Sequence, residues 1–175
     1  AAVARYHQVL QAARARGLEP MVTLNHYTLP LWLHDGKACK DDLDTCVHRG
    51  WVDLERIVPA IRTFSGYCAA EFGAEVDLWA TINEPMAVVI SGYLLPSAGR
   101  TNPPGVSLRV DEGVTVMFNM AEAHAQMYAA VHEHDGVDAN DDGVAAMGGP
   151  VPTVAAVERG GGRAPRAPAA VPHAE

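Results

Sequence analysis

The fold of this chain follows from the segment Val76-Asp77-Leu78-Trp79-Ala80-Thr81-Ile82-Asn83-Glu84-Pro85. Its apolar run predicts a buried strand over residues 76 to 83. Pro85 has no N–H to donate to a neighbouring strand, so the strand ends there, and it favours an extended conformation at Glu84. We therefore expect the Glu84 carboxyl at the C-terminal end of a buried strand, where parallel α/β folds and (β/α) barrels place catalytic groups.

Helices and strands alternate on both sides of this strand. The pattern predicts helices over residues 1 to 16, 53 to 73 and about 112 to 132, and an earlier buried strand over residues 21 to 25. Both strands are apolar rather than alternating, which is typical of a parallel sheet covered on both faces. The order predicts an α/β fold. Two strands alone leave unpaired edges, which implies neighbouring strands from another part of the protein or another chain.

Three further expectations concern connections and helix faces. Residues 27 to 51 are predicted as a long loop, punctuated by proline and glycine. The helix after Asp53 is expected to bury one apolar face and to end at Gly73. The apolar face expected for the last helix comprises Val114, Met117, Phe118, Ala121, Ala125 and Tyr128.

The C-terminal region differs in composition from the rest of the chain. Residues 135 to 142 are acidic and are predicted as a turn-rich surface loop. A third strand would be due near Val144, but no clear strand pattern occurs there. Residues 147 to 175 consist mainly of Gly, Pro and Ala, which predicts a low-complexity, disordered tail after a domain over residues 1 to 146. One hypothesis for this change is a shifted reading frame near Ala146.

Charge and hydropathy limit the function classes. The formal net charge of −8 argues against a nucleic-acid partner, which would need basic patches. The chain contains no run of eighteen apolar residues, so we expect no membrane span. It opens without a basic-then-apolar leader or an initiator Met, which favours a cytoplasmic protein and a chain that begins inside a larger gene product. The pattern assigns no oligomeric state.

The cysteines suggest neither a metal site nor a redox site. Cys39, Cys46 and Cys68 are odd in number and lack C-x-x-C spacing, so reduced thiols in a cytosolic protein are expected. The pairs His34-Asp35 and His132-His134 do not place both side chains on one face, which favours solvated surface over metal binding. We therefore predict no metal ligands and no cofactor.

Glu84 is the first candidate for catalysis, because glycosidic bond cleavage needs a carboxylic acid that protonates the leaving oxygen. Asn83 beside it offers a donor and an acceptor to a sugar hydroxyl. His26 follows the first strand, and neighbouring Tyr27 and Trp32 offer surfaces on which a sugar can stack. Structural alternatives remain open: Glu84 caps the next helix or pairs with an arginine, His26 is a satisfied core histidine, and the rings simply pack.

Two segments carry a family resemblance. They are Asn25-His26-Tyr27-Thr28-Leu29-Pro30-Leu31-Trp32-Leu33-His34-Asp35 and Trp79-Ala80-Thr81-Ile82-Asn83-Glu84-Pro85, supported by Gly50-Trp51, Phe64-Ser65, Gly92-Tyr93 and Pro103-Pro104-Gly105. In order and spacing, over roughly residues 1 to 145, they closely resemble glycoside hydrolase family 1. This is the β-glucosidase and β-galactosidase family, and the likeness is nearest to its archaeal branch.

The resemblance implies a partial (β/α)8 TIM barrel, comprising about strands 3 and 4 with their flanking helices. It implies retaining hydrolysis of β-glucosides or β-galactosides, with a small-molecule or oligosaccharide β-glycoside as partner and no cofactor. Glu84 would be the general acid/base, Asn83 would bind the hydroxyl next to the anomeric carbon, and His26 would contact the glycone ring. Tyr27 stands where the family usually has Trp.

The chain also departs from the family pattern. Family members are more than twice as long, and their nucleophile lies in a Glu-Asn-Gly motif that does not occur here. Glu71, Glu75 and Asp77 are expected at the wrong end of the sheet to meet Glu84. The prediction is a fragment without turnover of its own. The alternatives are another Asn-Glu-Pro barrel glycosidase, such as a cellulase-like one, and a non-catalytic sugar-binding or structural remnant.

Overall fold

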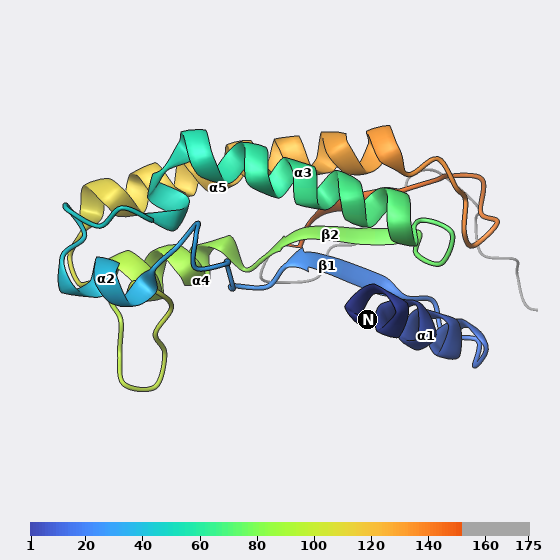
Figure 1. Cartoon of the computed structure of the whole chain (residues 1–175), viewed down its shortest axis with the longest axis horizontal. Coiled ribbons are helices and arrows are strands. Elements are labelled where there is room, and N and C mark those ends of the chain that lie inside the picture. Colours follow the sequence, from blue (N-terminus) through green and yellow to red (C-terminus); the bar gives the residue numbers. More distant parts are fainter. Residues whose placement is uncertain (152–175) are drawn as a thin grey trace, which may run out of the picture.

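A computed structural model describes residues 1–151 of the chain (Figure 1). The helices are α1 (Ala2–Arg14), α2 (Gly36–Asp41), α3 (Leu54–Phe72), α4 (Pro85–Val89) and α5 (Val110–His134), with a 3-10 turn η1 (Gly50–Val52) and a π-helical turn η2 (Ile90–Leu94). The strands are β1 (Met21–Asn25), β2 (Leu78–Asn83) and β3 (Met147–Val151). Among these helices, none is both long enough and apolar enough to cross a membrane.

The strands form one parallel sheet in the order β1-β2-β3. Met21 pairs with Leu78 and Asn25 pairs with Ile82, so the C-terminal ends of β1 and β2 lie at the same level. Helices α3 and α5 run side by side over the strands (Figure 1). Parallel strands joined through helices confirm the predicted α/β class, because a parallel connection needs a crossover long enough to contain a helix.

Two apolar clusters hold the helices to the sheet. The larger joins α2, η1, α3, α4 and α5 to the C-terminal half of β2; Trp51, Ile57, Ile82, Tyr93 and Met120 are among its buried members. The smaller lies near the N-terminal ends of the strands and includes Phe72, Val76, Trp79 and Val131. The larger cluster therefore supports the end of the sheet that carries Glu84.

The predicted apolar face of the last helix is wrong. Val114, Met117, Phe118 and Tyr128 are exposed, whereas α5 buries Val116, Met120, Ala123, Met127, Ala130 and Val131. The helix carries two apolar stripes, so periodicity alone does not choose between them. Asn119 Nδ2 donates a hydrogen bond of 2.9 Å to the Trp51 carbonyl, and this buried bond fixes the rotation of α5.

The region from residue 27 to 51 is more ordered than a loop, which corrects the prediction. It contains α2, whose first turn is capped by a 3.0 Å hydrogen bond from the Ala38 N–H to Asp35 Oδ1. Side-chain caps of this kind allow even a short helix to form. His34, just before the cap, is buried, and burial lowers its pKa below the ordinary histidine value.

β3 corrects a second expectation, since no clear strand was predicted near Val144. Residues 147–151 pair in parallel with β2, where Leu78 is the partner of Met147. The Gly-Gly-Pro sequence of this strand lacks the apolar pattern that identified β1 and β2, which explains why it was missed. β3 follows Ala146, the position near which a frame shift was hypothesised. Its five residues are the first five of the segment predicted as a disordered tail. The rest of that tail, residues 152–175, lies outside the described part.

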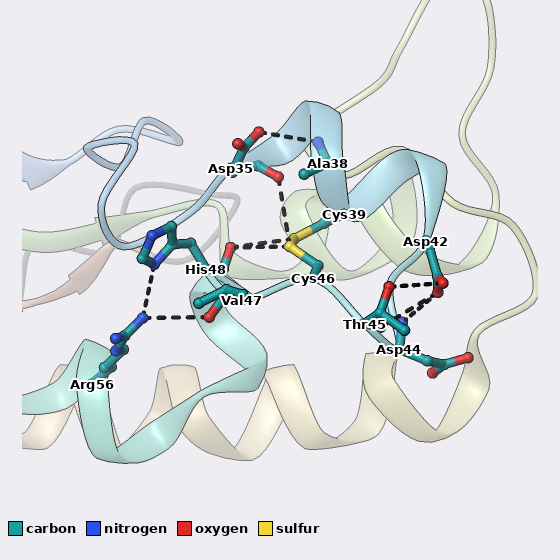
Figure 2. Close-up of a disulfide and its surroundings, with 10 residues drawn as sticks. All are labelled: Asp35, Ala38, Cys39, Asp42, Asp44, Thr45, Cys46, Val47, His48 and Arg56. Atoms are coloured by element: carbon teal, nitrogen blue, oxygen red, sulfur yellow. Dashed lines mark hydrogen bonds between the residues drawn. A yellow bond between two sulfur atoms is a disulfide. The ribbon is translucent and has the colours of Figure 1, made fainter.

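Cys39 and Cys46 form a disulfide (Figure 2), so the expectation of reduced thiols is wrong for these two residues. The turn after α2 brings their Cα atoms to 5.0 Å, within the range that a disulfide spans. Sequence spacing alone did not reveal this approach. Cys68 remains free and buried, and burial raises the pKa of its thiol to about 11. Disulfides are typical of oxidising compartments, so cytoplasmic localisation stays a prediction that this bond does not favour.

Reducing this disulfide is expected to lower the free energy of unfolding by about 2–3 kcal/mol, because the bond closes a short loop and restricts the unfolded chain. Urea unfolding with and without dithiothreitol measures the change. The matched control is Cys68→Ala, which removes the free thiol and should leave the effect of the reductant intact. A midpoint that does not move with reductant would contradict the assigned pairing.

Candidate active site

The turn between β2 and α4 places Glu84 at the C-terminal end of the sheet. β2 ends at Asn83, and Pro85 is the first residue of α4, a position that suits its fixed φ. Glu84 adopts a left-handed conformation with φ 42° and ψ 62°, not the extended conformation predicted from Pro85. The reason is that a single residue must turn the chain from strand to helix. Such a conformation costs about 1–3 kcal/mol in a non-glycine residue and is concentrated at functional sites.

Two side chains bind the same oxygen of the Glu84 carboxylate. The Tyr27 hydroxyl donates a 3.0 Å hydrogen bond to Oε2, and Arg100 Nη2 donates one of 3.2 Å. The backbone of Tyr27 is also left-handed, with φ 71°. Both residues joined by this hydrogen bond therefore have a positive φ. Burial, followed by the hydrogen bond to Glu84, raises the pKa of Tyr27, which keeps its hydroxyl a neutral donor at physiological pH.

The structural alternatives for Glu84 are resolved in different ways. It occupies the position before α4 but makes no side-chain capping hydrogen bond. It does pair with an arginine, Arg100, whose side chain is 67% exposed on the connection between η2 and α5. Ion pairs this exposed contribute about 0–1 kcal/mol. The ion pair with Arg100 forms at the C-terminal end of β2. Glu84 therefore lies at the end of the sheet that the sequence predicted.

The structure brings His26 to this end of the sheet as well. Asn25 pairs with Ile82, so His26 and Asn83 lie one residue further along adjacent strands. The His26 ring packs edge-on against Tyr27, with ring centroids 5.0 Å apart. His26 is exposed, which argues against the core-histidine alternative, and Asn83 is partly buried. The three predicted site residues, Glu84, Asn83 and His26, are thus grouped around Tyr27.

Sequence reasoning missed two features of this group. Tyr27 was considered only as a stacking surface, whereas its hydroxyl binds the carboxylate. Arg100 was not singled out at all, because nothing in the Ser97–Arg100 turn marks it as a partner of a residue sixteen positions earlier. The other predicted stacking surface, the Trp32 side chain, is 60% exposed and so remains accessible from solvent.

The two histidine pairs considered for metal binding serve other roles. Asp35 caps α2 while the neighbouring His34 ring is buried against Gly50, where φ is +60° and an added Cβ would lie 2.6 Å from His34 Cγ. His132 packs on Tyr128, with ring centroids 4.2 Å apart. Asp35 and His132 therefore each have a structural contact within residues 1–151, and the absence of metal ligands stays a prediction.

The C-terminal ends of β1 and β2 thus bring together a carboxylate, an amide, an imidazole and a phenol, and a carboxyl group is among the groups that glycoside hydrolysis needs. Residues 1–152 match the sequence profile of Glycosyl hydrolase family 1, so the chain belongs to that family. The family match decides against the cellulase-like alternative. It also continues past Ala146, so it does not support a frame shift at that point.

Individual relatives agree with the family match. The β-galactosidase of Pyrococcus woesei is 39% identical over 140 residues, which cover 80% of this chain and 27% of that protein. Among solved structures, Fpglu1 from Fervidobacterium pennivoraus superposes with a TM-score of 0.74 at 30% identity, covering 86% of this chain and 30% of that one. The β-glucosidase from Pyrococcus furiosus gives 0.70 at 30% identity, covering 76% and 27%.

The aligned part of the chain spans about a quarter of the length of the archaeal β-galactosidases it matches. Three parallel strands with helices over them are consistent with a fragment of a (β/α)8 barrel, the fold of these structural neighbours.

Proposed function

We propose that this chain contributes the acid/base part of a retaining β-glycosidase site, with Glu84 as general acid and then general base. In this proposal β1 and β2 are strands 3 and 4 of the complete barrel. The substrate is a β-glucoside or β-galactoside, as the names of the relatives suggest. The observation that carries the proposal is the Glu84 carboxylate, held by Tyr27 at the C-terminal end of a buried parallel strand.

The hydrogen bonds to Glu84 distinguish its two oxygens. Oε2 accepts from both Tyr27 and Arg100, and among the interactions of residues 1–151 none involves Oε1. Oε1 is therefore the oxygen available to carry a proton to the substrate. With the carboxyl side chain held through Oε2, the proton donor starts in a defined orientation, which is the positional requirement of general acid catalysis.

The reaction then has two steps. In the first, Glu84 transfers its proton to the leaving glycosidic oxygen as the bond from that oxygen to the anomeric carbon breaks and a second carboxylate bonds to that carbon. In the second, the Glu84 carboxylate removes a proton from water as the water oxygen displaces that carboxylate. Asn83 binds the hydroxyl next to the anomeric carbon, and exposed His26 contacts the sugar ring.

In this proposal the second carboxylate comes from a part of the complete barrel that this chain lacks. Retaining enzymes need two carboxyl groups about 5 Å apart. Asp77 lies at the opposite end of β2, about 20 Å away at the usual rise per strand residue. Glu71 and Glu75 both bind His7 of α1. The 175 residues contain no Glu-Asn-Gly motif.

We expect the purified 175-residue chain to show no turnover of aryl β-glucosides or aryl β-galactosides. The matched control is Glu84→Gln, which should behave identically because no complete site exists to lose. Turnover that this substitution abolishes would overturn the expectation, since it would mean that the chain itself supplies a nucleophile.

A chimera supplies the missing strands. In it, the aligned 140 residues of this chain replace their counterpart in the β-galactosidase of Pyrococcus woesei. The proposal predicts that this chimera hydrolyses aryl β-glycosides. A folded chimera without turnover would favour the alternative of a non-catalytic remnant.

A further inference from the structure

The loop between α5 and β3 has the spacing of a calcium-binding loop. Asp138-Ala139-Asn140-Asp141-Asp142-Gly143 fits the pattern D-x-[DN]-x-[DN]-G, in which oxygens at the first, third and fifth positions surround the ion. Gly143, at the sixth position, has φ +95°, a conformation that favours glycine. The loop is already turned inward, since the N–H groups of Asp142 and Gly143 donate to the two Asp138 oxygens at 3.1 and 2.7 Å.

A buried carboxylate from a different part of the chain lies against this loop. Asp77, just before β2, is 1% exposed, and its Oδ2 has no hydrogen-bond partner among residues 1–151. Its Oδ1 accepts only a long 3.4 Å hydrogen bond from the Ala139 N–H. Burying a carboxylate with so few partners is costly unless a cation compensates for it.

The carboxylates of Asp77, Asp138 and Asp142 converge on one point. One oxygen from each lies within 4.8 Å of the others, the spacing expected for oxygens around a cation that they bind at 2.3–2.6 Å. The salt bridges of residues 1–151 include none to these three residues. The nearby Arg14 guanidinium instead donates to the carbonyls of Ala139 and Glu75.

We propose that Asp77, Asp138 and Asp142 bind a Ca²⁺ ion at the N-terminal end of the sheet. Asn140, at the third position of the loop, and the Val144 carbonyl, at the seventh, would add oxygens as in other loops of this pattern. Three carboxylates, two from the loop and one from the start of β2, suit Ca²⁺ better than Mg²⁺, which demands a smaller octahedral site and keeps several of its waters. The site joins the start of β2 to the loop that leads into β3.

This cation site is separate from the proposed catalytic site. It lies at the opposite end of β2 from Glu84, the end of a barrel strand where side chains serve stability rather than catalysis. The bound ion would neutralise Asp77 and fix the loop that precedes β3. We therefore expect Ca²⁺ to stabilise the fold.

Metal binding is tested on the whole 175-residue chain by titrating it with Tb³⁺, a luminescent substitute for Ca²⁺, and displacing the Tb³⁺ with Ca²⁺. The loop lacks a bidentate Glu at its twelfth position, where Gly149 stands, so we expect an apparent Kd for Ca²⁺ between about 10 µM and 1 mM. Asp77→Asn and Asp142→Asn should each weaken binding about tenfold or more.

The matched control is Asp141→Asn, which removes the same charge from an exposed loop position that supplies no ligand. Its φ of 60° is tolerated by asparagine, and binding should change by less than about threefold. Equal weakening by all three substitutions would show general charge attraction and overturn the proposal. So would a failure of Ca²⁺ to displace Tb³⁺ from the wild-type chain at about 10 mM.

Thermal unfolding followed by circular dichroism separates loss of binding from loss of fold. Ca²⁺ at about ten times its wild-type Kd should raise the Tm of the wild-type chain by about 5 °C and that of Asp77→Asn by less than half as much. In EDTA, Asp77→Asn should unfold at the same temperature as the wild-type chain or higher, because it removes a buried charge. A wild-type Tm that is insensitive to Ca²⁺ would contradict the stabilising role.

Discussion

Glu84→Gln is expected to lower kcat about 10²–10⁴-fold in the Pyrococcus woesei chimera, measured with an aryl β-glycoside whose leaving group needs protonation. Glutamine preserves the size of the side chain and can still accept the hydrogen bond from Tyr27, but it has no proton to give. The loss should therefore appear in kcat rather than in the folding of the chimera. Steady-state kinetics and circular dichroism measure the two separately.

Glu71→Gln is the matched control for this substitution. It makes the same chemical change in a partly exposed residue that binds His7 near the other end of the sheet. We expect kcat to stay within about twofold of the unsubstituted chimera. Equal losses in the two variants would assign the effect of Glu84→Gln to altered charge or stability rather than to proton transfer.

Trp51→Ala is expected to have the largest effect on stability, lowering the free energy of unfolding by about 3–5 kcal/mol. The Trp51 side chain is 1% exposed and belongs to the larger apolar cluster, which also includes Ile57 and Met120. Its backbone carbonyl accepts the hydrogen bond from Asn119 that positions α5. Because single domains are stable by only about 5–15 kcal/mol, urea unfolding should show a strongly reduced midpoint.

Trp51→Phe separates the loss of volume from the loss of the indole nitrogen. The Trp51 Nε1 atom is buried and finds no hydrogen-bond partner in the described part of the chain, so phenylalanine removes an unsatisfied donor while retaining an aromatic ring. We expect a loss of less than about 1.5 kcal/mol. If phenylalanine destabilised the chain as much as alanine, the packing account of this cluster would be wrong.

The sequence predicted the elements whose signals are local. β1 coincides with the residues 21–25 expected from its short apolar run after Pro20, and β2 ends at Asn83, immediately before Glu84 and Pro85. Elements that depend on distant contacts were missed. The helix α5 carries apolar residues on two faces, and the contact of Asn119 with Trp51 accompanies burial of the face that was not predicted. β3 contains a Gly-Gly-Pro segment with no local strand pattern, and it is recognised as a strand only by its pairing with β2.

The candidate site divides in the same way. Glu84, Asn83 and His26 could be grouped from sequence because parallel strands end at one edge of a sheet, so residues that follow two such strands lie close together. The Tyr27 hydrogen bond and the Arg100 ion pair depend on side-chain directions and on a loop that returns to the site. Nothing in the local sequence encodes those directions. The left-handed backbone at Glu84 also differs from the extended conformation that a following proline favours.

The role of Glu84 as proton donor is tested most directly by leaving-group dependence in the chimera. Glu84→Gln is compared with the unsubstituted chimera on methoxyphenyl and dinitrophenyl β-glycosides, and kcat/KM is measured for each. Methoxyphenolate is a poor leaving group that needs a proton, whereas dinitrophenolate departs without one. The account predicts a loss of about 10²-fold or more for the first substrate and a much smaller loss for the second. Equal losses on both substrates would contradict it.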